Sequence, residues 1–300
     1  MSARGGRAEP AVFLEGVLRQ ALGETALEVL GVEPVGGGCI HHAVKVHTTR
    51  GDWFAKWNDG CAPDLFLSEA EGLRALREGE PELAIPEVLC ALPPGADRPA
   101  CIVMEYLPPG AGAARDDIRL GRGLAAIHAR PAPVFGFPVT TYCGPTPQDN
   151  RESPSWPGFY AERRIRPLVQ RLEQEERIGP GERAVLERLI ARLPALLAHE
   201  ARPALIHGDL WSGNVLATTR GPALVDPACA ACDREMEFGI TTLFGGFGER
   251  FFDAYEEALP LPGGWRERNP LYQLYHLLNH HLIFGGHYGR EALAVARRYA

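Results

Sequence analysis

The sequence predicts an α+β protein of two units, a small one built on an antiparallel sheet with one key helix and a larger, mostly helical one. Short apolar strands separated by turns dominate residues 1–107, whereas helical periodicity dominates residues 108–300. Pro108-Pro109-Gly110 interrupts both patterns, and 300 residues is the length of about two domains. We therefore place the boundary between the two units after Leu107.

In the first unit, apolar residues at helical spacing predict helices over 10–22 and 63–77. Strands are expected where β-branched and aromatic residues are bounded by turn residues. The segment 49–52 contains Gly51-Asp52 and predicts the turn of a hairpin. The predicted strands are 27–35, 42–48, 53–57, 85–92 and 100–106.

In the second unit, a segment rich in Pro, Thr and Gly predicts a long loop over 131–155. Three short apolar runs predict strands over 204–207, 214–217 and 223–226. The remainder has helical periodicity. The predicted helices are 116–128, 156–176, 182–199, 235–244, 249–259, 270–284 and 290–299.

Composition narrows the class of protein. Hydrophobic residues make up 45% and charged residues 23%, which is typical of soluble globular chains. The net charge of −7 argues against nucleic acid or an anionic membrane surface as the main partner. No apolar run approaches the roughly 20 residues that span a bilayer. The seven cysteines are odd in number and scattered, which favours a reducing compartment and predicts a cytoplasmic protein.

The most informative stretch is 207–214, which reads His-Gly-Asp-Leu-Trp-Ser-Gly-Asn. Asp209 and Asn214 have the H-x-D-x-x-x-x-N spacing of kinase catalytic loops. Such an aspartate accepts the proton of an attacking hydroxyl, and the amide oxygen is a ligand for Mg²⁺. Asp226 follows the next predicted strand, where a second metal carboxylate is required. The alternative is a solvated turn with an incidental Asp and Asn.

Lys56 is a candidate cation for the phosphates of a nucleotide, because it lies in an apolar strand after a Gly-rich turn. The alternative is a lysine that extends from a strand edge into water. Glu69 lies on the apolar stripe of the helix 63–77, where a carboxylate needs a partner. We therefore predict that Lys56 and Glu69 form a pair, and that Glu71, on the other side of the helix, is solvated.

The glycine-rich segment Gly36-Gly37-Gly38-Cys39-Ile40 lies between two predicted strands. Its backbone N–H groups are able to wrap the phosphates of a nucleotide. Three glycines also form ordinary turns, so its position before the lysine strand is what favours this interpretation. A P-loop of the type G-x-x-x-x-G-K-[ST] is absent from the sequence.

The sequence resembles the fructosamine kinases (ketoamine 3-kinases), within the protein-kinase-like and aminoglycoside-phosphotransferase-like superfamily. The resemblance covers nearly the whole chain and implies a bilobal protein-kinase-like fold with an ATP-binding N-lobe (1–107) and a catalytic, substrate-binding C-lobe (108–300). The motifs that carry it are Gly37-Gly38-Cys39-Ile40, His207 to Asn214 with Trp211, Asp226-Pro227-Ala228, Glu235-Met236-Glu237-Phe238, Leu243-Phe244-Gly245-Gly246-Phe247 and Leu271-Tyr272-Gln273-Leu274.

By this resemblance ATP and Mg²⁺ are the cofactors. Asp209 is implied as the catalytic base, Asn214 and Asp226 as Mg²⁺ ligands, and Lys56 with Glu69 as the pair that holds the ATP phosphates. The backbone of a hinge is implied to contact adenine. That hinge consists of Met104, Glu105, Tyr106 and Leu107.

The resemblance also implies the reaction, which is transfer of the γ-phosphate of ATP to a sugar hydroxyl, the 3-hydroxyl, of a ketoamine such as fructosamine, ribulosamine or erythrulosamine. The substrates are small ketoamines or glycated protein lysines, and phosphorylation destabilises the adduct, which leads to deglycation. A kinase of the aminoglycoside or choline type stays open, as does a nucleotide-binding pseudokinase scaffold. Retention of all five polar site residues together disfavours the scaffold.

Trp211, Asn279 and His280 are candidates to line a polyol pocket, although a packed helix with satisfied histidines is equally consistent with the last two. His276 and His280 are four residues apart, but Leu277 follows His276 where a metalloprotease needs Glu.

The remaining motifs contain cysteine. Cys229 and Cys232 have C-x-x-C spacing without a second pair, so we interpret them as incidental thiols rather than a zinc site. Cys39, among glycine N–H groups and near Lys56, is expected to oxidise readily. A disulfide between two copies would then give a redox-dependent homodimer. The alternative is an inert turn residue.

Overall fold

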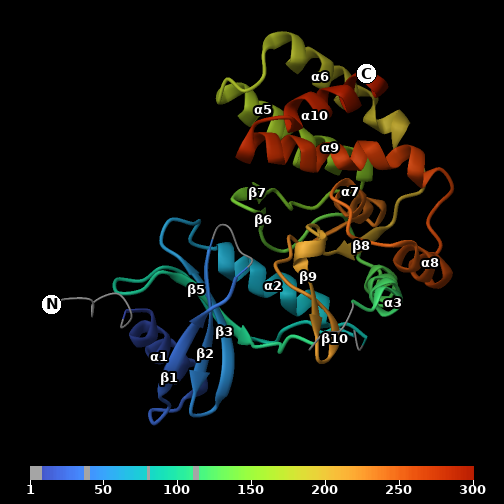
Figure 1. The fold of residues 1–300 in the computed structure, drawn as a ribbon. Coiled ribbons are helices and arrows are strands. Elements are labelled where there is room, and N and C mark those ends of the chain that lie inside the picture. Colours follow the sequence, from blue (N-terminus) through green and yellow to red (C-terminus); the bar gives the residue numbers. More distant parts are fainter. Residues whose placement is uncertain (1–8, 37–40, 80–81, 111–114) are drawn as a thin grey trace.

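The computed structural model describes residues 9–36, 41–79, 82–110 and 115–300, which form two lobes (Figure 1). The small lobe is built on a five-stranded antiparallel sheet in the order β1-β2-β3-β5-β4. Its elements are α1 (Glu9–Leu22), β1 (Val29–Pro34), β2 (His42–Thr48), β3 (Gly51–Asn58), α2 (Leu65–Arg77), β4 (Val88–Leu92) and β5 (Ala100–Glu105).

A helix covers each face of this sheet. Leu18 of α1 packs in the same apolar cluster as Ala55 of β3, whereas Phe66 of α2 packs with Ile102 of β5 on the other face. Because side chains alternate along a strand, Lys56 lies on the face opposite to Ala55. The alternation therefore places Lys56 on the side of α2.

The helix α2 is also fixed to the large lobe. Its apolar side shares one core cluster with the helices α3, α7 and α8. Gly72 lies against Pro227, where a Cβ would come within 3.2 Å of the proline ring. At the end of α2, Arg130 donates hydrogen bonds to the carbonyl oxygens of Ala75 (3.1 Å) and Leu76 (3.4 Å). The helix is thus a shared element of both lobes.

The large lobe is mostly helical, and α9 packs against α7 and α10. Three small two-stranded sheets supplement the helices. Its elements are α3 (Asp117–His128), β6 (Thr141–Cys143), β7 (Thr146–Gln148), α4 (Trp156–Phe159), a π-helical segment (Tyr160–Ile165), α5 (Arg166–Gln174), α6 (Pro180–Leu196), β8 (Pro203–Ile206), a 3₁₀ turn (Ser212–Asn214), β9 (Val215–Thr218), β10 (Gly221–Leu224), β11 (Ala230–Asp233), α7 (Glu235–Leu243), α8 (Glu249–Ala258), α9 (Trp265–Phe284) and α10 (Tyr288–Tyr299).

This architecture confirms the α+β prediction, and several details differ from it. The loop expected over 131–155 contains the hairpin β6–β7, whose three-residue strands are too short to show alternation. The sequence did not predict the strand β11, which pairs with β8, because its residues lie just before the helix α7 and carry no separate strand signal. The helix expected over 156–176 contains a π-helical segment, and the turn expected over 49–52 closes between the paired residues Thr48 and Gly51.

The helix α9 begins at Trp265 rather than at 270, where Pro270 predicts a start. The first turn of α9, before Pro270, is held in the helix by tertiary contacts, and these outweigh the local signal of the proline. The Trp265 ring packs 5.6 Å from that of Phe238, and Arg268 donates to the carboxylate of the buried Glu235 at 2.9 Å. Among the described residues, no helix has the length and apolar character needed to cross a membrane.

The closest approach between α3 and α8 requires glycine. A Cβ on Gly121 would overlap the carbonyl oxygen of Phe251, which is backbone and has little room to shift. We expect Gly121→Ala to lower the free energy of unfolding by about 1–3 kcal/mol, since overpacking outweighs the gain in helix propensity. Denaturant unfolding of the purified protein measures this change.

Gly16→Ala is the matched control, because Gly16 lies in the helix α1 with nothing within 4 Å of the added Cβ. There the substitution is expected to stabilise by up to about 1 kcal/mol. Equal effects of the two substitutions would contradict the close packing of α3 on α8.

Candidate active site

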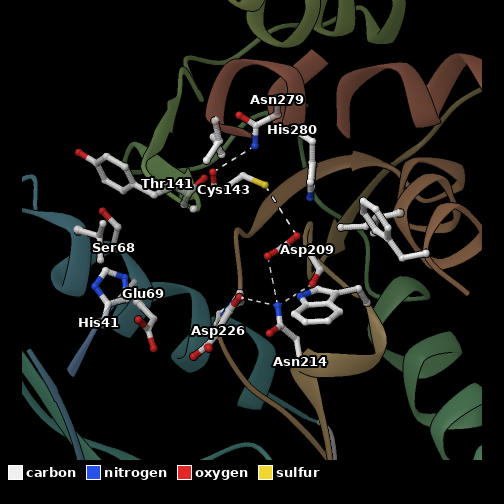
Figure 2. Close-up of a pocket in the computed structure, with 18 of the residues that line it drawn as sticks. His41, Ser68, Glu69, Thr141, Cys143, Asp209, Asn214, Asp226, Asn279 and His280 are labelled. Atoms are coloured by element: carbon white, nitrogen blue, oxygen red, sulfur yellow. Dashed lines mark hydrogen bonds between the residues drawn. The ribbon is translucent and has the colours of Figure 1, made fainter. Parts of the chain in front are cut away.

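The loop 207–214 connects β8 to β9 and carries the predicted base (Figure 2). At Gly208, φ is +81° and a Cβ would overlap the carbonyl oxygen of Ala228, so this position requires glycine. Asn214 closes the loop, because its Nδ2 donates to the backbone oxygen of Asp209 at 2.8 Å and to Oδ2 of the Asp209 carboxylate at 3.2 Å. The two predicted residues therefore lie in direct contact.

A buried glutamate fixes the start of this loop. Glu237 of α7 is 0% exposed, and its two carboxylate oxygens accept the backbone N–H groups of His207 at 2.5 Å and Gly208 at 3.0 Å. A carboxylate that accepts two backbone N–H groups forms charge-assisted hydrogen bonds, which are stronger than neutral ones. Glu237 thus positions the residue immediately before Asp209.

Lys56 joins three segments that are far apart in the sequence. Its Nζ lies 2.7 Å from Oε1 of Glu69 in α2 and 2.5 Å from Oδ1 of Asp226, which follows β10. The Lys56 and Glu69 side chains are 6% and 9% exposed, whereas that of Asp226 is 49% exposed and opens into the cleft. The pair of Lys56 with Glu69 agrees with the prediction, and so does the exposed Glu71, which forms a surface ion pair with Arg74.

Asp226 adopts a left-handed backbone conformation, with φ at +57°. This region is uncommon for residues other than glycine and carries a cost that surrounding contacts must outweigh. Here the neighbouring Val225 donates its N–H to the carbonyl oxygen of Asn214 at 3.1 Å, and Lys56 holds the carboxylate. The backbone oxygen of Asp226 lies 3.5 Å from Nδ2 of Asn214 (Figure 2), whereas its carboxylate contacts Lys56.

Burial and charge perturb the ionisation of these groups. Burial, followed by the nearby carboxylate of Asp226, raises the pKa of Asp209 to about 7. Burial would lower the pKa of Lys56, but Asp226 and Glu69 outweigh it and raise that pKa, so Lys56 stays charged. Burial opposes ionisation of Asp226, and Lys56 outweighs this effect and lowers the pKa of Asp226.

The donors at this point suit a divalent cation with oxygen ligands. Asp226 offers a carboxylate that opens into the cleft, and Asn214 uses Nδ2 for its hydrogen bonds, which leaves its Oδ1 for a cation. Carboxylate and amide oxygens are the ligands that Mg²⁺ takes. The residues present therefore fit this metal.

One cavity of about 440 Å³ brings most of the predicted residues together. The predicted residues that line it are Lys56, Glu69, Asp209, Trp211, Asn214, Asp226, Asn279 and His280.

Apart from Lys56, the residues predicted to bind the nucleotide do not line this cavity as far as the structure describes them. Gly36 is exposed after β1, and Gly37, Gly38, Cys39 and Ile40 lie outside the described residues. The redox-dependent homodimer through Cys39 therefore stays a prediction.

The predicted hinge connects the two lobes and does not line the cavity. Met104 is buried in β5 with Glu105 at the end of that strand, and Tyr106 lies under Nζ of Lys45 at 4.5 Å from the ring centroid. Leu107 packs in a small cluster with Ala84 and Ala223 between the lobes. A contact of this segment with adenine stays a prediction.

The predicted substrate residues form one wall of the cavity. The Trp211 ring is 39% exposed and packs over Gly213, whose lack of a side chain makes room for it. Asn279 donates to the carbonyl oxygen of Cys143 at 3.2 Å. The His280 ring lies 4.8 Å from that of Phe244, which also lines the cavity.

Sequence reasoning missed several residues of this cavity. Thr141 and Cys143 line it from the β6–β7 hairpin, and His41 lines it from the start of β2. Nothing in their local sequence marks them, because tertiary packing alone brings them to the site. Glu237 had a detectable signal, since a glutamate at an otherwise apolar position of a helix needs a partner.

Cys229 and Cys232 are both buried and free, and among the described residues neither belongs to a group that could hold a metal. Cys229 donates to the carbonyl oxygen of Gly72 at 3.6 Å, and Cys232 lies in β11 on the other core cluster. The structure therefore agrees with two packed thiols.

The two lobes and the cluster of Lys56, Asp209 and Asp226 between them define a phosphotransferase with a protein-kinase-like fold. A family model described as Fructosamine kinase matches residues 14–299. The chain therefore belongs to the fructosamine kinase family.

Named relatives agree with this assignment. The chain is 35% identical over 282 residues to a chloroplastic protein-ribulosamine 3-kinase of Oryza sativa subsp. indica, covering 91% of this chain and 80% of the relative. It is 38% identical over 260 residues to a protein of Vibrio parahaemolyticus named as a probable ketoamine kinase, covering 85% and 88%. The crystal structure of a fructosamine-3-kinase candidate from Thermobifida fusca matches with a TM-score of 0.82 and 34% identity over 94% and 98% of the two chains.

The contact of Glu237 with the loop predicts a positioning role. Glu237→Gln places an amide N–H₂ against a backbone N–H, so one hydrogen bond is lost and its partner stays buried. We expect kcat for phosphoryl transfer to fall roughly 10- to 100-fold as the base is displaced, with a smaller change in KM for ATP. Steady-state kinetics measures both constants.

Glu249→Gln, on the exposed start of α8, is the control and is expected to keep wild-type kinetics. A Glu237→Gln enzyme that folds and turns over at the wild-type rate would show that the loop keeps its position without the carboxylate.

Proposed function

We propose that this protein transfers the γ-phosphoryl group of ATP to a hydroxyl, the 3-hydroxyl, of the sugar in a ketoamine, either a small molecule or a glycated protein lysine. The observation that carries this proposal is the meeting of Lys56, Asp209 and Asp226 in one cavity of a chain that belongs to the fructosamine kinase family. Phosphoryl transfer needs positioning and charge stabilisation more than covalent chemistry, and these side chains supply both.

Asp209 is assigned the role of base. It faces the cavity and is held by Asn214 on one side, with its loop anchored by Glu237. A carboxylate in this place orients the attacking hydroxyl and accepts its proton as the phosphoryl group moves. Because its pKa is raised by burial, Asp209 is a better proton acceptor than a solvated aspartate.

Lys56 is assigned to the phosphates of ATP, with Glu69 fixing its ammonium group. Asp226 and Asn214 are assigned to Mg²⁺, which neutralises charge on the phosphates when bound. The 2.5 Å contact between Lys56 and Asp226 brings the cation for the phosphates and the carboxylate for the metal to one point. The Gly-rich segment and the 104–107 hinge are assigned to the rest of the nucleotide.

The chemistry of the cavity suits a ketoamine. Among the polar groups that line it, Oδ1 of Asn279 has no hydrogen-bond partner among the described residues and is available for a hydroxyl of a sugar chain. The wall of Trp211, Phe244 and Phe284 is 39%, 38% and 63% exposed, and it offers apolar surface to the amine substituent. The ribulosamine and ketoamine kinases among the relatives carry names for the same substrate class.

Asp209→Asn tests the reaction directly. The substitution keeps the size of the side chain but removes the proton acceptor, so we expect the rate of ketoamine phosphorylation to fall about 10²–10⁴-fold. Affinity for ATP is expected to change much less. Coupled ATP consumption with ribulose-, erythrulose- and fructose-amines, followed by NMR of the product, measures the rate and the position of the phosphate.

Asp253→Asn, on the exposed side of α8, is the control for the loss of one carboxylate. Near-normal turnover by Asp209→Asn would remove Asp209 from the role of base. Phosphorylation of aminoglycosides or choline, with none of the ketoamines, would overturn the proposed substrate class.

Trp211→Ala tests the substrate wall. Loss of the ring removes an apolar contact of about 1–1.5 kcal/mol, so KM for the ketoamine is expected to rise roughly 10-fold while KM for ATP stays close to wild type. Leu30→Ala removes an exposed apolar side chain on β1, outside the cavity, and serves as the control. A matching rise in both KM values would place Trp211 outside the sugar pocket.

A further inference from the structure

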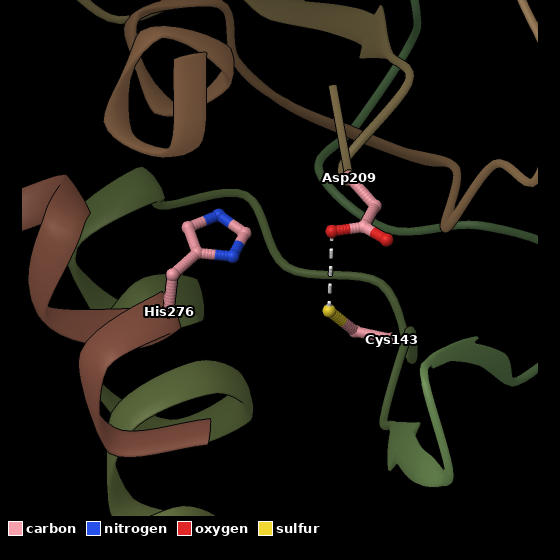
Figure 3. A group of neighbouring side chains, drawn as sticks. All are labelled: Cys143, Asp209 and His276. Atoms are coloured by element: carbon pink, nitrogen blue, oxygen red, sulfur yellow. Dashed lines mark hydrogen bonds between the residues drawn. The ribbon is translucent and has the colours of Figure 1, made fainter. Parts of the chain in front are cut away.

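A second group of metal-ligating side chains meets at the base. Cys143 of β6, Asp209 of the catalytic loop and His276 of α9 each bring one ligand atom to within 4.8 Å of the others (Figure 3). The Sγ of Cys143 lies 3.8 Å from Oδ1 of Asp209. This is the carboxylate oxygen on the side away from Asn214, which contacts Oδ2.

The histidine of this group has an unused nitrogen. His276 is 1% exposed, and among the described residues its Nδ1 has no hydrogen-bond partner. Figure 3 shows the imidazole ring turned toward Asp209 and Cys143. A buried polar atom without a partner costs about 1–3 kcal/mol, so an unpartnered nitrogen at this place indicates a ligand between the three side chains.

The donor types select the ligand. Mg²⁺ takes oxygen ligands, whereas a thiolate, an imidazole and a carboxylate together are a typical donor set for Zn²⁺. Tetrahedral Zn²⁺ with Zn–S near 2.3 Å and Zn–O near 2.0 Å separates sulfur from oxygen by roughly 3.5 Å. The 3.8 Å between Cys143 and Asp209 is already close to that separation. The ligand atom of His276 lies within 4.8 Å of both and is the third donor.

We propose that Cys143, Asp209 and His276 form an inhibitory site for Zn²⁺, distinct from the oxygen-donor site at Asn214 and Asp226. On binding, the S–H bond of Cys143 breaks, an S–Zn bond forms and the proton passes to the buffer, with no oxidation or reduction. Cys143 and Asp209 line the cavity, which gives an ion access to them. The inhibitory effect rests on the proposed function, whereas the binding of the metal does not.

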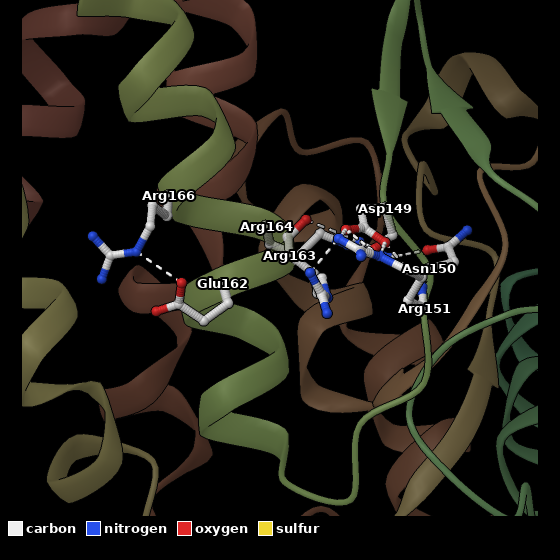
Figure 4. A network of polar contacts seen from close by, with 7 residues as sticks. All are labelled: Asp149, Asn150, Arg151, Glu162, Arg163, Arg164 and Arg166. Carbon is white, nitrogen blue, oxygen red and sulfur yellow. Dashed lines mark hydrogen bonds and ion pairs between the residues drawn. The ribbon is translucent and has the colours of Figure 1, made fainter.

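The hairpin that carries Cys143 is held in place by a buried polar network (Figure 4). Arg164 is 1% exposed and donates to Oδ1 of Asn150 at 2.6 Å and to the carbonyl oxygen of Asp149 at 2.9 Å. Asn150 donates in turn to Oγ1 of Thr141 at 2.8 Å, and Thr141 begins the strand of Cys143. Second-layer support of this kind fixes a metal ligand before the metal binds.

Inhibition follows from the shared carboxylate. A Zn²⁺ ion that takes Oδ1 of Asp209 withdraws electron density from the carboxylate, which then no longer accepts the proton of the attacking hydroxyl. The ion also occupies the inner end of the cavity, where the sugar hydroxyls are proposed to lie. Added Zn²⁺ should therefore lower kcat for the ketoamine even at saturating Mg²⁺ and ATP.

The first experiment measures metal binding without activity. Zn²⁺ and Co²⁺ are added to the reduced full-length protein in the absence of nucleotide, with calorimetry for Zn²⁺ stoichiometry and absorption for the thiolate–Co²⁺ charge-transfer band. The wild type is expected to show the band and to bind one Zn²⁺ ion more than Cys143→Ser, which is expected to lose the band. His276→Gln should weaken Zn²⁺ binding at least 10-fold and serves if Cys143→Ser does not fold.

Cys229→Ser is the matched control, because Cys229 is also buried but lies outside any candidate metal group among the described residues. It is expected to keep the band and the wild-type affinity for Zn²⁺. A wild type without the band, or Cys143→Ser and His276→Gln enzymes that bind Zn²⁺ as the wild type does, overturns the site.

The second experiment titrates Zn²⁺ against ketoamine phosphorylation, with each variant normalised to its own rate without Zn²⁺. Half-inhibition of Cys143→Ser and His276→Gln is expected at Zn²⁺ concentrations at least 10-fold above that of the wild type and Cys229→Ser. Equal inhibition of all four enzymes overturns the inhibitory role. A protein that binds Zn²⁺ at Cys143 but phosphorylates no ketoamine contradicts the proposed function and leaves the metal site established.

Discussion

The ammonium group of Lys56 forms ion pairs with carboxylates of both lobes, and the rest of the site depends on this interaction. It contacts Glu69 of the small lobe and Asp226 of the large lobe, which lies 170 residues away in the sequence. Two carboxylates with one nearly buried cation leave an excess of negative charge, so the arrangement favours the approach of a further cation. In the proposed function, the metal ion held at Asp226 neutralises this excess of negative charge.

The helix α2 makes this arrangement possible because it belongs to two cores at once. It covers one face of the sheet that carries Lys56, and it packs through Gly72 on the segment that follows Asp226. A shift of α2 relative to either lobe would separate the ion pairs and leave buried charges without partners, which is strongly unfavourable. The geometry of the site and the relation between the lobes are therefore held by the same contacts.

The sequence pattern was sufficient to group site residues that follow a regular helix or loop spacing. The apolar stripe of α2 predicted that Glu69 pairs with Lys56, and the loop spacing predicted that Asp209 and Asn214 belong to one site. The sequence could not place Cys143 or His276, since they reach Asp209 only through the packing of the β6–β7 hairpin on α9. Three-residue strands and a histidine inside a helix carry no periodic signal.

The position of Asp209 exposes it to two kinds of chemistry. One carboxylate oxygen faces Asn214 and the oxygen-donor site, while the other faces the sulfur of Cys143. A hard cation near Asp226 favours the ionised form of Asp209 from a distance and keeps it available as a base, whereas a softer cation bound directly to Asp209 removes it from catalysis. The same burial raises the pKa of this carboxylate and places it beside the sulfur of Cys143, so the two proposals, catalysis by Asp209 and inhibition by Zn²⁺, have one physical origin.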